Sequence, residues 1–204
     1  MGFALVTAAT SDPLDASEVA SEILDWQANN ANLAMLEQRI SEATLYVQEE
    51  TARQFMQATY VQTWDDWPDA MKLDIRPISS ITSVKYYDAD GTLTTVIASD
   101  YWFDRYASRS MPDIVFKPSF SWPVVELWRP SAVQVTFVAG YASAAVVPAT
   151  AKLAIRQLAM YWYNQRQAVA VSDSVEPAAT RPAFGELPFG VRQAIQQLNA
   201  SGYT

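Results

Sequence analysis

The sequence predicts an α+β protein: an N-terminal antiparallel helix pair, a small antiparallel β-domain, a C-terminal helix, a linker and a terminal short helix. Two observations predict this class. Apolar and acidic residues recur at helical spacing up to about residue 57, and again after Pro148. Between Tyr60 and Tyr141 the residues are instead aromatic or β-branched and are interrupted by prolines, which is typical of β-structure.

Residues 1–14 are expected to form an extended arm that leads into the helix pair. The first helix should begin at a capping box, because Asp15 is followed three residues later by Glu18. The second helix should be capped by Asn32 and run to about Gln57. Its predicted apolar stripe consists of Leu33, Leu36, Ile40, Ala43, Val47 and Phe55.

Short strands should make up the β-domain, in the order 60–64, 78–87, 93–97, 101–106, 114–117 and 133–139. Gly91 lies in the loop between the second and third of these strands, where a tight hairpin needs a residue with positive φ. The last strand has the clearest alternation and ends at Gly140. These features predict an antiparallel sheet.

Pro148 should open a helix over 149–167, because proline costs nothing in the first turn. The domain prediction places the helix pair and β-domain in 1–147 and this helix, packing on the same domain, in 148–167. Residues 168–204 are expected to hold a flexible linker and a C-terminal interaction helix that begins near Pro188. One structural domain is expected overall.

Composition excludes several classes of function. The 204 residues include no histidine and no cysteine, so the chain cannot build a Ser–His–Asp triad, a thiolate nucleophile or a Cys-ligated metal site. The net charge of −8 argues against tight nucleic-acid binding. Residues 1–70 hold 12 acids and 2 bases, so the acidic charge is concentrated in the predicted helix pair. We expect no catalytic residue, no metal, no cofactor and no membrane segment.

One segment could carry chemistry. Asp65 and Asp66, flanked by Trp64 and Trp67, could serve a carbohydrate-binding module or a carboxylate glycosidase. Neighbouring residues of a strand point to opposite faces, however, so these carboxylates are better placed to end a strand and accept turn amides. The chain also has aromatic and arginine side chains of the kind that anchor protein interfaces, and these favour a role in assembly over a role in sugar chemistry. The candidates for a subunit interface are Trp128, Arg129, Trp162 and Arg166.

Several short motifs in collinear order resemble the head–tail connector (adaptor, or head-completion) proteins of long-tailed bacteriophages and gene transfer agents. The main motif is AVQVTFVAGY at 132–141, followed by Val147, Pro148 and a helix with Trp162. The other motifs are PL at 13–14, ETAR at 50–53, VKYYD at 84–88, SWP at 121–123 and LPFGVR at 187–192. Ala52 stands where the family pattern usually has glycine.

The resemblance implies a structural virion protein, made in the host cytoplasm, that forms a ring beneath the portal in the head–tail neck. Such a ring, a homo-oligomer of twelve copies, joins head to tail, extends the DNA channel, helps retain packaged DNA and touches double-stranded DNA only passively. Its partners would be the portal and a downstream connector or tail protein. The terminal helix would contact the portal or a neighbour, through Phe189, Val191, Arg192, Ile195 and Leu198; packing of this helix on its own domain is the alternative.

Overall fold

A computed structural model describes residues 2–23, 30–104, 112–125, 130–171 and 187–200. These residues form two compact units. The sheet unit draws its described residues from 2–11 and 52–143, and the helical unit draws its residues from 12–51 and 144–200. The helical unit thus combines segments from both sides of position 147, where the first domain boundary was predicted.

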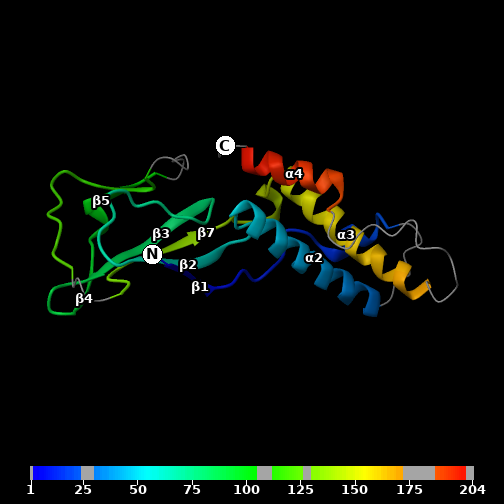
Figure 1. The fold of residues 1–204 in the computed structure, drawn as a ribbon, viewed down its shortest axis with the longest axis horizontal. Helices are drawn as coiled ribbons and strands as arrows, with labels where there is room; N and C mark the ends of the chain where they lie inside the picture. The colour runs from blue at the N-terminus through cyan, green and yellow to red at the C-terminus, as the bar shows by residue number, and fades with distance from the viewer. Residues whose placement is uncertain (1, 24–29, 105–111, 126–129, 172–186, 201–204) are drawn as a thin grey trace. The chain divides into compact units, whose positions relative to one another are not determined.

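The sheet unit contains a five-stranded antiparallel sheet in the order β1-β2-β7-β3-β4 (Figure 1). Its strands are β1 (Gly2–Thr7), β2 (Ala58–Trp64), β3 (Ile78–Tyr87), β4 (Leu93–Thr95) and β7 (Val133–Ala139). A second sheet pairs β5 (Tyr101–Phe103) with β6 (Ile114–Phe116), after the 3-10 turn η1 (Ala98–Asp100). The predicted α+β class and antiparallel sheet are confirmed. The extended arm predicted for 1–14 is in part a strand, β1.

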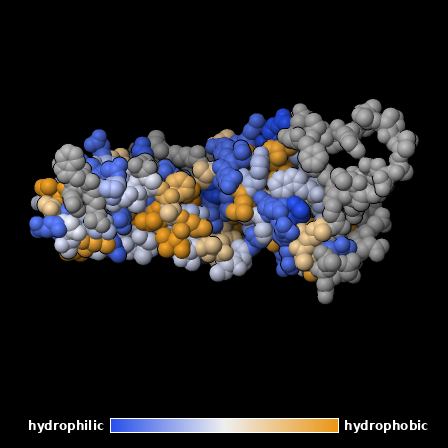
Figure 2. Space-filling model, turned by 60° about the horizontal axis from the view of Figure 1, so that its bottom comes forward, coloured by the Kyte–Doolittle hydropathy of each residue, from blue (hydrophilic) through white to orange (hydrophobic). Residues whose placement is uncertain are grey.

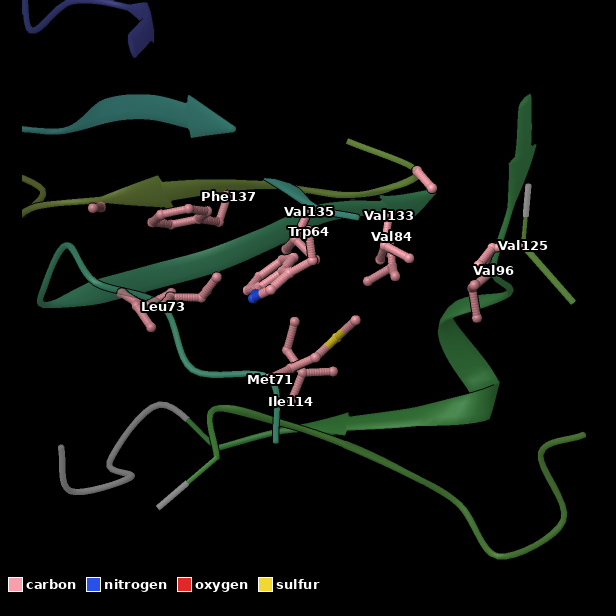
Figure 3. Packing of buried hydrophobic residues seen from close by; sticks show 13 residues of the cluster. Trp64, Met71, Leu73, Val84, Val96, Ile114, Val125, Val133, Val135 and Phe137 are labelled. Carbon is pink, nitrogen blue, oxygen red and sulfur yellow. The ribbon is translucent and has the colours of Figure 1, made fainter. Parts of the chain in front are cut away.

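The core of the sheet unit lies on one face of the central strands. Alternate residues of β7 are fully buried, in agreement with the strong alternation of this segment. Figure 3 shows Trp64 and Val84 from the sheet facing Met71 and Ile114 on the opposite layer. The loop between β3 and β4 is a tight turn, in which Gly91 has a φ of 75° and Asp88 accepts hydrogen bonds from the amides of Asp90 and Thr92.

An ion pair between Arg76 and Asp113 is buried in the sheet unit. The Arg76 side chain is 4% exposed and that of Asp113 is 0% exposed, and Arg76 Nη2 lies 2.7 Å from the carboxylate. The amide of Leu73 also donates to Asp113 Oδ2, at 2.8 Å. Burial raises the pKa of Asp113, against the opposing effects of the Leu73 amide and the Arg76 guanidinium. This pair joins the segment before β3 to the segment before β6.

The helical unit is built from α1 (Ala16–Ala20), α2 (Asn30–Thr51), η2 (Ala144–Val146), α3 (Ala149–Val171) and α4 (Phe189–Ala200). Helix α3 contacts both α2 and α4 (Figure 1). The predicted stripe of α2 is correct at Leu36, Ile40, Ala43 and Val47, which are all buried. Among the described residues, no helix is long and apolar enough to cross a membrane.

Helix α1 is capped as predicted but is shorter than its apolar spacing suggested. Asp15 Oδ1 accepts hydrogen bonds from the hydroxyl of Ser17 and, at 2.7 Å, from the amide of Ser17, and these contacts lower the pKa of Asp15. Glu18 pairs with Arg156 of α3 at 3.0 Å, and Glu22 pairs with the same arginine at 2.8 Å. The Ser21 hydroxyl bonds to the carbonyl of Glu18, which competes with continuation of the helix.

Helix α2 ends at Thr51, before the predicted end at Gln57. Ala52 follows in the left-handed region, with a φ of 49°, and Thr51 Oγ1 donates to the carbonyl of Val47. Phe55, which the stripe included, lies beyond the helix and is fully buried in the sheet unit. The conformation of Ala52 is the one that glycine adopts at a helix C-terminus.

We therefore expect Ala52→Gly to stabilise the protein by about 0.5–1 kcal/mol, because glycine has no Cβ to strain at positive φ. Chemical denaturation measures the change. Ala34→Gly, at an exposed position inside α2, is the control and should destabilise by a similar amount. A loss of stability in Ala52→Gly would contradict the left-handed conformation.

Candidate assembly surfaces

Helix α4 packs on its own unit through most of the residues predicted to reach a partner. Val191, Ile195 and Leu198 are buried, while Phe189 is 71% exposed and Arg192 is also exposed. Asn199 Nδ2 donates to the carbonyl of Glu50 near the end of α2, at 3.3 Å. The apolar stripe of α4 is therefore used inside the unit, and Phe189 and Arg192 are the residues of this set at the surface.

A groove of about 560 Å³ runs between α3 and α4. The α3 side contributes Leu153, which is 47% exposed, together with Lys152 and Arg156. Gly190, next to Phe189, lines the α4 side with glutamine side chains. An apolar floor with cationic and amide groups around it suits a protein segment better than a small charged ligand.

The four residues predicted for a subunit interface have different positions. Trp162 of α3 is half-buried and meets Tyr46 of α2 edge-to-face, with 6.1 Å between ring centroids. Trp128 and Arg129 lie outside the described residues. Arg166 belongs to α3, but its side chain is outside the described part of the structure.

The tryptophan and aspartate residues at 64–67 have structural partners. Trp64 is only 8% exposed. Asp65 Oδ1 accepts the amide of Ser131 at 2.8 Å, and Asp66 Oδ1 accepts the amide of Trp67 at 2.7 Å. Both carboxylates satisfy backbone amides at the end of β2, as the strand-end interpretation predicted.

The half-buried ring of Trp67 lies in an aromatic cluster. Its centroid is 5.3–6.2 Å from four other rings, and its Nε1 donates to the carbonyl of Pro123 at 3.0 Å. The four neighbours are Tyr86, Phe116, Phe120 and Trp122. Within the described residues, no group of three or more acidic side chains is arranged to hold a metal ion.

The architecture matches solved structures of gene transfer agent (GTA) particles. No protein-family model matches the chain, and no curated protein matches it. A chain in the neck of a native GTA particle, computed with C12 symmetry, aligns over 97% of this chain and 94% of its own length, at 22% identity and a TM-score of 0.67. This chain has the fold of that neck component.

Two further solved structures of GTA particles contain chains with the same fold. A chain in the virion of a native GTA particle covers 97% of this chain and 95% of its own length, with 21% identity and a TM-score of 0.66. A chain in the neck of an empty GTA particle, computed with C6 symmetry, covers the same shares with 22% identity and a TM-score of 0.69. The shared fold is consistent with the resemblance to head–tail connectors.

Sequence reasoning missed one surface of this fold. All six residues of β1 are exposed, and Phe3, Leu5 and Val6 have exposed fractions of 58%, 53% and 58%. The uninterrupted apolar run from Gly2 to Val6 was a signal of a strand. Its exposure on both faces could not be read from the pattern, because such a run usually indicates a buried strand.

Proposed function

We propose that this chain is a non-enzymatic structural virion protein that forms a ring beneath the portal and joins head to tail. The observation that carries the proposal is the shared fold with neck components over 97% of the chain. Those neck structures were computed with C12 and C6 symmetry, which supports a cyclic ring, and we propose twelve copies. In this role the ring extends the DNA channel and helps retain the packaged DNA.

The charge of the chain supports passive contact with DNA. A protein that grips DNA needs a cluster of lysine and arginine to replace the counterions of the phosphates. This chain has a net charge of −8, and Arg39 and Arg156 in the helical unit pair with glutamates. The proposed ring therefore lets DNA slide along the channel.

We further propose that the α3–α4 groove, with Phe189 at its side, docks the portal, and that another surface receives a downstream connector or tail protein. Phe189 is a large aromatic residue that is 71% exposed, beside a groove with an apolar floor. Aromatic residues that fill a partner's pocket provide much of the binding energy in protein interfaces. Arg192 is exposed on the same helix and could pair with a carboxylate of the partner.

Phe189→Asp should weaken portal binding by at least about tenfold, because it removes an aromatic anchor and adds a charge at an apolar contact. The fold should be unchanged, since the side chain is exposed. Co-purification of the full chain with the portal measures binding, and thermal unfolding checks the fold.

Val146→Asp is the matched control, because Val146 is an exposed apolar residue of the same unit, with 58% exposure, outside the groove. This variant should bind the portal normally. Undiminished portal binding by Phe189→Asp would refute the docking site, and lack of portal binding by the wild-type chain would refute the proposed function.

A further inference from the structure

Strand β1 is an edge strand that carries no charged residue and no proline. The sheet order gives β1 one neighbour, β2, so no strand of the described residues lies on its outer side. Soluble proteins normally protect such edges with charges, prolines or bulges. Residues 2–7 contain no charged residue and no proline, and the only shift in register lies between Leu5 and Thr7.

The side chains of β1 are also unsuited to water. Phe3 and Leu5 project from one face of the strand, Val6 lies at the register shift between Leu5 and Thr7, and each of the three is more than half exposed. Figure 2 shows hydrophobic side chains gathered over the part of the sheet unit where β1 lies. An apolar surface of this kind usually marks a site that a partner covers.

The sheet unit has a second apolar surface, away from β1. The opposite edge of the five-stranded sheet is β4, which carries exposed Leu93 and is followed by Ile97, with 68% exposure. Trp102 and Val115, directly paired across β5 and β6, are 55% and 41% exposed. Within the described residues, the large exposed apolar side chains of the sheet unit all belong either to β1 or to the segment 93–124.

We propose that β1 of one copy packs on the surface that carries Leu93, Ile97, Trp102 and Val115 in the next copy, and that this head-to-tail contact closes the ring. The inference rests on the proposed ring function. A cyclic ring of more than two copies is built from heterologous contacts, in which one surface meets a different surface of the neighbour. Two separate apolar surfaces on the same unit, one of them on an edge strand without charge or proline, provide such a pair.

Leu5→Lys tests the first surface. A lysine at the centre of β1 should reduce the number of copies built into particles by about tenfold, because its charge would be buried against apolar residues. Leu45→Lys is the matched control, since Leu45 is an exposed leucine of α2, with 58% exposure, in the other unit. Circular dichroism of both purified variants checks that they fold. Normal incorporation of a folded Leu5→Lys chain would overturn the proposal.

Cross-linking shows which surface of the neighbouring copy covers β1. The chain has no cysteine, so Leu5→Cys and Ile97→Cys can be introduced together without background and treated in purified particles with a flexible bis-maleimide. A ladder of covalent multimers is expected in the double variant, and no multimers in either single variant. Dimers of Leu5→Cys alone would show that like surfaces meet, and particles that contain the double variant without a ladder would equally overturn the contact. In both cases the proposed function would stand, whereas absence of the wild-type chain from particles would refute the function as well.

Discussion

Arg76→Ala is expected to lower the free energy of unfolding of the sheet unit by about 3–5 kcal/mol, the usual cost of removing one partner of a buried ion pair. The substitution leaves the carboxylate of Asp113, which has no exposed surface, with the Leu73 amide as its remaining described donor to Oδ2. Burial already raises the pKa of Asp113, so the charged form becomes still more costly without the guanidinium.

The loss of stability in Arg76→Ala should depend on pH, because the pKa of Asp113 is raised in the folded protein. A carboxyl whose folded pKa exceeds its unfolded value makes the protein less stable as pH rises through the interval between the two values. Removal of Arg76 widens that interval, so the destabilisation should be smaller in acid than at neutral pH. Denaturant titrations followed by tryptophan fluorescence, in acid and at neutral pH, measure the free energy of unfolding of the variant and of the wild-type chain.

Arg39→Ala is the matched control. Arg39 pairs with Glu42 on the surface of α2, where both side chains are about one-third exposed, so its loss should cost less than about 1 kcal/mol. Equal effects of the two substitutions, or equal effects at both pH values, would contradict the role of the buried pair.

Gly140→Ala is expected to destabilise the sheet unit by about 2–6 kcal/mol. Gly140 directly follows β7 and has a φ of 108°, where an L-residue is strained by about 1–3 kcal/mol. An added Cβ would also lie 2.5 Å from the carbonyl oxygen of Met56, so the backbone must move at a further cost of about 1–3 kcal/mol.

Two other glycines separate these contributions. Gly91→Ala introduces the strain of positive φ in a hairpin loop and should cost about 1 kcal/mol. Gly2→Ala meets only an ordinary contact, 3.6 Å from Thr63 Oγ1, and should be nearly neutral. Denaturant unfolding should rank the three variants in this order, and a neutral Gly140→Ala would show that the described approach of β7 to Met56 is incorrect.

The sequence predicted the strands well where one physical signal dominated. The bounds of β3 agree with the prediction, and β7 follows its alternation to Gly140, the glycine of the AVQVTFVAGY motif. Element ends were predicted less well. The apolar stripe continued past Thr51 to Phe55, but the left-handed Ala52 ends α2 and places Phe55 in the other unit.

The assembly surfaces were less predictable than the fold. An amphipathic helix has the same pattern whether it packs on its own unit or on a partner, so the burial of Val191 and Leu198 on α3 and α2 could not be read from α4 alone. The four rings that contact Trp67 are 19 or more residues away from it in sequence. They meet Trp67 only in the folded unit, so the sequence pattern around Trp67 could not reveal them. The exposure of β1 is likewise a property of sheet order.

Cryo-electron microscopy of particles purified from cells that produce this chain would locate the chain in the particle. We expect a closed ring of this fold between the capsid portal and the tail, with α4 toward the portal and β1 of each copy against its neighbour. Particles whose neck lacks this chain, or in which the chain is present outside the neck, would contradict it.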